Sequence, residues 1–267
     1  MRAPMRSVSV LVLVGMLGAA SASAQRPTAT SDDPLTPGTF SILGFDPMTG
    51  EIGAAVQSRV FSVGNGVLWA EAGVGAVATQ AIVDVSYGPQ GLTLLRAGMA
   101  PADIIKTILA NDADPGYRGQ AWPKAGRQFA VMNAKGEFAA YTGPQATTWA
   151  GDKQGKYCTA QGNILAGPAV VEKMVEAFEG SEFVKNPDGT RGRRNHISLR
   201  LVAALEAGDA AGGDTRGKQS AALIVVKKDA GVWLHNDVVL RLQVDDNPEP
   251  IAELRRLVEK SPAGRAR

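Results

Sequence analysis

The chain has 267 residues, 45% of them hydrophobic, with a single cysteine. This length suits one α/β domain with a substantial core, and one cysteine excludes an intramolecular disulfide. The 28 basic residues fall to 26 if Arg2 and Arg6 are removed with an export signal, which equals the number of acidic residues, 26. A neutral mature chain argues against a protein that binds nucleic acid through a basic surface.

The first 24 residues have the pattern of a signal peptide. Arg2 and Arg6 give a positive start, residues 8–17 are apolar, and Ala22-Ser23-Ala24 has the small residues of a cleavage site. The alternative is a transmembrane anchor, but the apolar run is shorter than the roughly 20 residues that span a bilayer. We therefore expect a periplasmic or secreted protein that is not bound to the membrane once the signal is removed.

Composition divides the rest of the chain. Residues 25–38 are rich in Pro, Thr, Ser and Asp without an apolar period, which predicts a disordered leader, either a plain linker or a propeptide. Residues 39–260 hold the periodic apolar segments and form the predicted globular domain. Residues 261–267 are predicted to be a flexible tail.

The domain is predicted to begin with a β-hairpin. Residues 39–45 and 51–58 read as strands joined by the turn 46–50, which contains Pro and Gly. If residue 45 faces residue 51, Thr39 lies opposite roughly residue 57. This register brings Gln57, Ser58 and Arg59 beside Thr39.

Further along the chain, small-residue strands and amphipathic helices follow one another. Up to residue 166 we expect a strand-loop-strand over 67–81, helices over 88–97 and 101–109, a hairpin over 127–142, and mixed loop and strand over 149–166. Two helices follow, over 167–178 and 195–207, and a polar basic loop over 185–194 lies between them. The domain ends with strands over 219–227 and 232–244 and a helix over 250–258.

This order predicts an α+β fold with mixed or antiparallel sheets and outer helices, because strands and helices do not alternate as βαβ units. A four-layer αββα sandwich accommodates it, since two facing sheets bury strands rich in Gly, Ala and Val on both faces. Residues 73–78 resemble a dinucleotide fingerprint, but no helix pattern or acidic partner follows, so no cofactor is expected.

Four separated blocks of sequence carry a family resemblance. They are Thr39-Phe40-Ser41-Ile42, residues 69–80, residues 161–165, and residues 211–221 with Ala211-Gly212-Gly213-Asp214. Together they resemble the bacterial domain-of-unknown-function family 1028 (DUF1028), from Thr39 to about Lys260. The resemblance implies the αββα sandwich of the N-terminal-nucleophile (Ntn) hydrolases and an amide-hydrolase ancestry, but no substrate. In the common pattern of the family the threonine follows only the initiator Met, whereas here residues 25–38 would still precede it.

Thr39 is the expected nucleophile. An Ntn enzyme activates its terminal hydroxyl with its own α-amine, whose unperturbed pKa is about 7.7 to 8.0. Gly38 tolerates the strained backbone that an attack of the Thr39 hydroxyl on the preceding carbonyl requires. We therefore expect autoproteolysis between these two residues; the alternative is that Thr39 only begins a strand.

Two charged residues are candidate partners of Thr39. Arg59 would hold the amine neutral or bind a substrate carboxylate, and its alternative is a surface arginine at a strand end. Asp214 would orient the amine or Arg59, and its alternative is an aspartate that caps a turn.

Several polar residues are candidates for binding substrate or the oxyanion. Their alternative is a structural role as buried, satisfied polar groups. They are Ser58, Thr79, Gln80, Asn163, Gln219 and Ser220.

The remaining chemistry-bearing residues give weaker patterns. A pair of Cys158 with His196 or His235 has no local signature, and no spacing typical of metal ligands is present. The sequence therefore predicts an exported Ntn hydrolase of a small amide or peptide-like bond, without metal or cofactor. The alternative is a non-catalytic protein that binds a small ligand in the same cleft, and the sequence leaves a homo-oligomer open.

Overall fold

The computed structural model describes residues 38–117, 119–231 and 236–262. The predicted signal peptide, the leader up to residue 37, part of the expected strand 232–244 and most of the expected tail lie outside these residues. Within the described ranges, no helix has both the length and the apolar character needed to cross a membrane.

One sheet has six strands, and every neighbouring pair in it is antiparallel. The first two strands of the chain, β1 and β2, occupy its centre. The sheet order is β12 (Val238–Val244), β11 (Ser220–Val226), β2 (Glu51–Ser58), β1 (Thr39–Asp46), β8 (Cys158–Leu165) and β7 (Trp149–Gly155).

A second sheet has four antiparallel strands in the order of the chain. They are β3 (Leu68–Glu71), β4 (Gly75–Ala81), β5 (Arg127–Asn133) and β6 (Phe138–Thr142).

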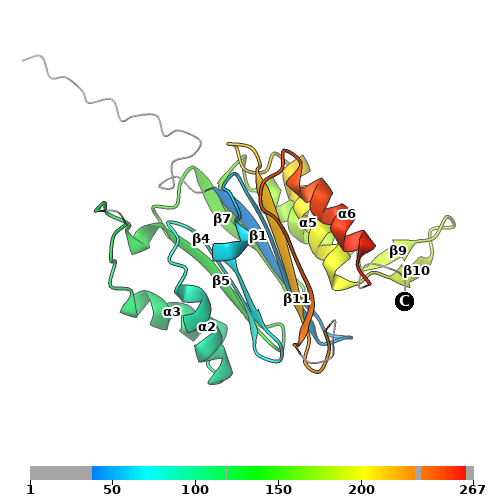
Figure 1. Cartoon of the computed structure of the whole chain (residues 1–267), viewed down its shortest axis with the longest axis horizontal. Helices are drawn as coiled ribbons and strands as arrows, with labels where there is room; N and C mark the ends of the chain where they lie inside the picture. Colours follow the sequence, from blue (N-terminus) through cyan, green and yellow to red (C-terminus); the bar gives the residue numbers. More distant parts are fainter. Residues whose placement is uncertain (1–37, 118, 232–235, 263–267) are drawn as a thin grey trace, which may run out of the picture.

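The long helices lie on the outer faces of the two sheets (Figure 1). Helices α2 (Tyr87–Arg96) and α3 (Pro101–Asn111) contact the four-stranded sheet. On the six-stranded sheet lie α4 (Ala169–Gly180), α5 (Ile197–Ala210) and α6 (Pro250–Lys260). The short elements are α1 (Gly64–Val67), the 3-10 helix η1 (Lys124–Gly126), and the hairpin of β9 (Phe183–Lys185) and β10 (Arg191–Arg194).

Alternation along β1 explains how the sheets pack, because successive side chains point to opposite faces. Phe40 and Ile42 belong to the cluster between the six-stranded sheet and its helices. Leu43 and Phe45 belong to the cluster between the two sheets. A third cluster lies under α2 and α3. The predicted combination of antiparallel sheets with helices outside them is confirmed.

The first hairpin differs from its predicted register by one residue. Phe45 pairs with Ile52 rather than residue 51, so Thr39 pairs with Ser58 rather than residue 57. Asp46 stays in the strand because its carboxylate accepts the backbone N–H groups of Met48 at 2.9 Å and Thr49 at 3.3 Å. The connecting turn is therefore residues 47–50, one residue shorter than expected.

The predicted polar loop over 185–194 is instead the two-stranded β9–β10 hairpin. Its turn is closed by a hydrogen bond from the Asn186 N–H to the Thr190 carbonyl at 3.0 Å, and Gly189 takes the positive φ of 82° that the turn requires. The hairpin projects from the body of the protein (Figure 1).

Candidate functional site

Thr39 begins β1 in the middle of the six-stranded sheet and faces the second sheet. In the sheet register it lies between Ser58 of β2 and Asn163 of β8. Only 2% of Thr39 is exposed. Two of the predicted polar candidates are therefore direct neighbours of the predicted nucleophile.

The carbonyl group of Gly38 is the centre of a chain of hydrogen bonds. The Thr39 hydroxyl donates to the Ser58 hydroxyl at 3.1 Å, and the Ser58 hydroxyl donates to the Gly38 oxygen. The Arg216 guanidinium donates to the same oxygen from Nη2 at 2.6 Å. The carbonyl directly before Thr39 thus accepts from two donors, one of which is cationic.

Asp214 holds the Arg216 guanidinium in place. Its carboxylate accepts from Arg216 Nε at 3.0 Å and from Nη2 at 2.6 Å, and also from the Arg216 backbone N–H at 3.0 Å. The Asp214 side chain is fully buried. Its turn is anchored to the end of β8, where the Thr215 N–H donates to the Ile164 carbonyl at 3.0 Å. Such a bidentate pair fixes both the direction and the charge of the guanidinium.

A buried network of amide side chains lies beneath Thr39. Gln80 donates to the Thr39 carbonyl at 3.3 Å and to Gln128 Oε1 at 2.8 Å. Its own Oε1 accepts from the Ser41 hydroxyl at 2.5 Å, and Gln161 donates to that hydroxyl at 2.6 Å. These hydrogen bonds join β4 and β5 of one sheet to β1 and β8 of the other, although Gln161 Oε1 is buried without a partner among the described residues. The glutamines therefore link the two sheets at the base of the site.

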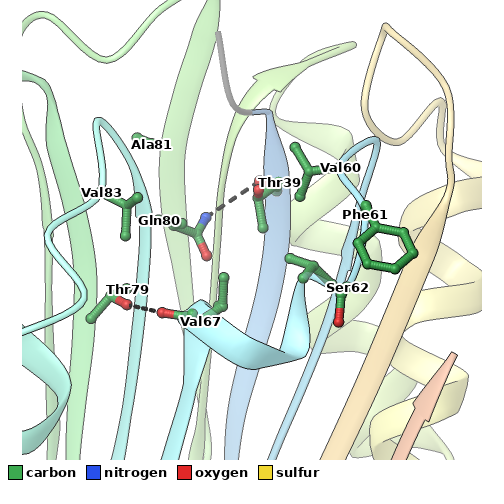
Figure 2. A pocket seen from close by; sticks show the side chains of 11 residues that line it. Thr39, Val60, Phe61, Ser62, Val67, Thr79, Gln80, Ala81 and Val83 are labelled. Atoms are coloured by element: carbon green, nitrogen blue, oxygen red, sulfur yellow. Dashed lines mark hydrogen bonds between the residues drawn. The ribbon is translucent and has the colours of Figure 1, made fainter. Parts of the chain in front are cut away.

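A cavity of about 200 Å³ opens beside Thr39. Figure 2 shows it between the start of β1, the segment after β2, and the end of β4. Most of its lining is apolar, although Thr39, Ser62, Thr79 and Gln80 contribute polar groups. The apolar side chains are those of Val60, Phe61, Val63, Val67, Ala81 and Val83.

Strained backbone occurs at two residues that line this cavity and at one near Thr39 in the sheet. Ser62 has φ of 55° and Ala81 has φ of 65°, and both line the cavity. Ile164, which follows Asn163, has φ of 55°. Left-handed conformations of residues other than glycine cost on the order of 1–3 kcal/mol each and cluster at functional sites.

Thr79 and Ser220 support the walls of the cavity. The Thr79 hydroxyl donates to the Gly66 carbonyl at 2.7 Å. The Ser220 hydroxyl donates to the Val60 carbonyl at 2.6 Å and accepts from the Val63 N–H at 3.0 Å. Both hydroxyl protons are therefore used to hold the segment that carries Val60 and Val63.

Arg59 and Gln219 contact each other. Arg59 Nη1 donates to Gln219 Oε1 at 2.9 Å, and Gln219 donates onward to Asp246 Oδ1 at 3.1 Å. The guanidinium that reaches Gly38 is that of Arg216, which was not among the predicted site residues. A signal was available, because a side-chain oxygen of Asp in a turn commonly bonds the backbone two residues on.

Cys158 is not a suitable nucleophile. It is fully buried opposite Gly44 on β8, and burial raises the pKa of its thiol to about 12. His196 caps α5, where its Nδ1 accepts the Ser198 N–H at 3.2 Å and its Nε2 lies 3.0 Å from Glu51. His235 lies outside the described residues, and within them no three His, Cys, Asp or Glu side chains gather as a metal site would require.

Comparison with known proteins agrees with the resemblance seen in the sequence. The family model described as "Family of unknown function (DUF1028)" matches residues 39–254. A search of curated proteins found no match. The chain is similar to the crystal structure of a DUF1028 protein from Silicibacter pomeroyi, with 31% identity and a TM-score of 0.69 over 84% of this chain and 88% of that one. The chain therefore belongs to the DUF1028 family of unknown function.

Proposed function

We propose that the protein is an exported Ntn hydrolase that exposes Thr39 by cutting its own chain after Gly38 and then hydrolyses a small amide or peptide-like bond. In this proposal the two facing sheets and their outer helices are the four-layer αββα sandwich of the Ntn hydrolases. The substrate is a small molecule, neither nucleic acid nor membrane takes part, and residues 1–24 direct export to the periplasm or the medium.

The observation that carries the proposal is the set of contacts at the Gly38 carbonyl. Attack on a carbonyl places negative charge on its oxygen, and donors that already point at that oxygen stabilise the transition state. Arg216 and Ser58 both donate to it. The nucleophilic hydroxyl of Thr39 belongs to the same hydrogen-bonded chain.

The processing step balances without any added reagent other than water. Thr39 Oγ1 bonds to the Gly38 carbonyl carbon, the Gly38–Thr39 C–N bond breaks, and the hydroxyl proton passes to the Thr39 nitrogen. Water then cleaves the resulting ester, which frees a leader ending in the Gly38 carboxylic acid. Thr39 is left with a free α-amine, the base that its hydroxyl requires.

Turnover repeats this chemistry on an external amide. The Thr39 α-amine takes the proton of Oγ1 as the oxygen attacks the substrate carbonyl, and the proton then passes to the leaving amine. Water hydrolyses the acyl-enzyme ester and releases the carboxylic acid. The apolar cavity beside Thr39 suits a small apolar part of the substrate.

The extent of the family match supports the same interpretation. It begins at Thr39, so the region that this chain shares with its family starts with the proposed nucleophile.

The rival proposal is a binding protein that keeps its leader. The observation in its favour is that the cavity beside Thr39 is present while Gly38 is still attached. Such a protein would hold a small apolar ligand next to an inert threonine.

The intact mass and the N-terminal sequence of the purified protein decide between the two. We expect a start at Thr39 in the wild type and an unprocessed chain in Thr39→Ala, with turnover lost as well. Thr39→Ser keeps a nucleophile and should still be processed. Thr93→Ala, at an exposed threonine of α2, is the matched control. A stable start at Gln25 in active wild-type protein would contradict the proposal.

A further inference from the structure

We propose that the enzyme rejects acyl groups with an L-configured substituent on the α-carbon, the carbon next to the reacting carbonyl, because that carbon takes the place of the Gly38 Cα. This inference rests on the proposed function and names the acyl half of its substrate. It depends on the space around Gly38, which is buried against the Asp214–Arg216 pair.

A substituent in the L position of the Gly38 α-carbon would collide with the ion pair. A Cβ built there lies 2.8 Å from Arg216 Nη2, 2.9 Å from Arg216 Nε and 2.9 Å from Asp214 Oδ1. Carbon atoms do not approach nitrogen and oxygen atoms that closely unless something shifts. The L position of the Gly38 α-carbon therefore has room for a hydrogen atom but not for a carbon atom.

The ion pair is poorly able to shift. Arg216 Nη2 and Nε both donate to Asp214, and Nη2 also donates to the Gly38 carbonyl. Asp214 is buried and belongs to a turn that bonds to β8. Moving the guanidinium away from an L-configured substituent would break a hydrogen bond to a buried carboxylate or to the reacting carbonyl, and both losses are costly.

The position of Gly38 is also the position of a substrate's acyl group. During processing, the Gly38 acyl group becomes an ester of Thr39 Oγ1. During turnover, the substrate's acyl group forms the same ester on the same oxygen, after its C–N bond has broken. Both esters present one carbonyl oxygen to Ser58 and Arg216, so both place the α-carbon against Asp214.

The charge of the site points to a neutral acyl group. The positive charge of Arg216 is matched by the bidentate Asp214 carboxylate. A carboxylate on the acyl chain would have to compete with Asp214 for the guanidinium, so the pair stabilises the reacting carbonyl rather than a second anion. The apolar cavity on the other side of Thr39 is lined by neither residue of the pair and takes the amine half.

The test compares two substrates, N-acetylglycyl p-nitroanilide and N-acetyl-L-alanyl p-nitroanilide, with the processed wild-type protein. They differ by one methyl group, which occupies the L position of the α-carbon. Each kcat/KM is divided by the rate of hydroxide hydrolysis of the same compound, which removes the intrinsic effect of the methyl group. We expect the corrected ratio to favour the glycyl compound by at least about tenfold, the factor that corresponds to a loss of about 1.4 kcal/mol of transition-state stabilisation.

Hydrolysis of both compounds with a corrected ratio near one, or a preference for the alanyl compound, would overturn the inference while leaving the hydrolase proposal intact. Hydrolysis of neither compound, nor of acetyl p-nitroanilide, by protein that starts at Thr39 would overturn the hydrolase proposal and the inference with it. Release of p-nitroaniline, followed by its absorbance, serves as the measurement for all three compounds, and Thr39→Ala is the blank.

Discussion

Arg216 Nη2 lies 2.6 Å from the carbonyl oxygen of Gly38, a residue 178 positions earlier in the chain. Asp214 holds the guanidinium in a bidentate pair, so the donor is fixed before any charge develops on the carbonyl. Preorganised donors of this kind supply a large part of the stabilisation in acyl transfer.

Replacing Arg216 should therefore slow leader release. We expect Arg216→Gln to reduce its rate by roughly 100- to 1,000-fold, as for the loss of one oxyanion donor. Arg216→Lys keeps the charge but loses the bidentate fork and should be intermediate. The measurement is the fraction of processed chain over time by intact mass, with thermal unfolding to verify the fold.

Arg59→Gln is the matched control, because Arg59 donates to Gln219 and not to Gly38. It should process at the wild-type rate. If Arg59→Gln stops processing and Arg216→Gln does not, the guanidinium that leader release requires is that of Arg59 and not that of Arg216.

Ser58 and Ser220 face each other across β2 and β11, are both fully buried, and allow a paired test. Ser58 donates to the Gly38 carbonyl, whereas Ser220 donates to the Val60 carbonyl. Ser58→Ala should slow leader release by roughly 10- to 100-fold, as for the loss of one weaker, neutral donor. Ser220→Ala should lower the free energy of unfolding by about 1 kcal/mol and leave processing unchanged. If Ser58→Ala and Ser220→Ala slow leader release equally, Ser58 acts only through the stability of the fold.

Much of the fold follows from local sequence. The hairpin at Thr39, the helix opened by Pro101 and the strand over 127–133 are visible as apolar periods bounded by turn residues. The one-residue register shift of the first hairpin is not visible in the sequence, because it depends on hydrogen bonds from the turn to the Asp46 side chain. The alternation of apolar and polar residues along a strand does not show at which residue the strand ends.

The site was predictable to a lesser extent, because its parts come from distant segments. Thr39 and Ser58 share a hairpin, so the sequence brought them together. Arg216 reaches Gly38 only through the turn after α5, and that long-range contact has no periodic signature. The same holds for Val60 and Phe61, whose apolar side chains line the cavity after β2 has ended.

The cavity beside Thr39 predicts a separation of processing from turnover. Val83→Phe should fill part of the cavity and raise the KM for p-nitroanilides by about tenfold, since a lost apolar contact is worth about 1–3 kcal/mol. Leader release should be unaffected, because Gly38 does not line the cavity. Val184→Phe, on the exposed β9 strand, is the control and should leave the KM unchanged. A normal KM in Val83→Phe would remove the cavity from the substrate site.

Glu51 predicts a dependence of stability on pH. Burial disfavours its carboxylate, but hydrogen bonds from His196 and Thr49 and the charges of His196 and Lys227 outweigh burial, so the pKa of Glu51 lies below its ordinary value of 4.5. A lowered folded-state pKa gives stability that is present above pH 4.5 and is lost as the pH falls through the folded-state value.

Glu51→Gln should therefore remove about 1–3 kcal/mol of the free energy of unfolding at pH 7, and less as the pH is lowered below 4.5. The measurement is urea unfolding between pH 7 and pH 3. Glu172→Gln, at an exposed position of α4, should follow the wild type at every pH. A constant difference between Glu51→Gln and wild type across this range would exclude the ionised carboxylate as the cause.

The last prediction concerns Gly38→Ala, which adds a single methyl group directly beside the Asp214–Arg216 ion pair. In Gly38→Ala the added carbon meets Arg216 and Asp214 at less than 3.0 Å, so the guanidinium must leave the carbonyl or the Gly38–Thr39 peptide must move away from it. We expect leader release to slow by at least about tenfold, since each 1.4 kcal/mol of lost transition-state stabilisation is a factor of ten. Gly167→Ala is the control, because a Cβ there meets nothing within 4 Å.

A double variant tests whether the methyl group acts through the ion pair. Asp214→Ala removes the carboxylate, so leader release should be slow in Asp214→Ala alone and equally slow in the double variant Gly38→Ala/Asp214→Ala. Wild-type processing of Gly38→Ala would show that the ion pair yields to a methyl group in the L position, and the selectivity against L-substituted acyl groups would lose its structural basis.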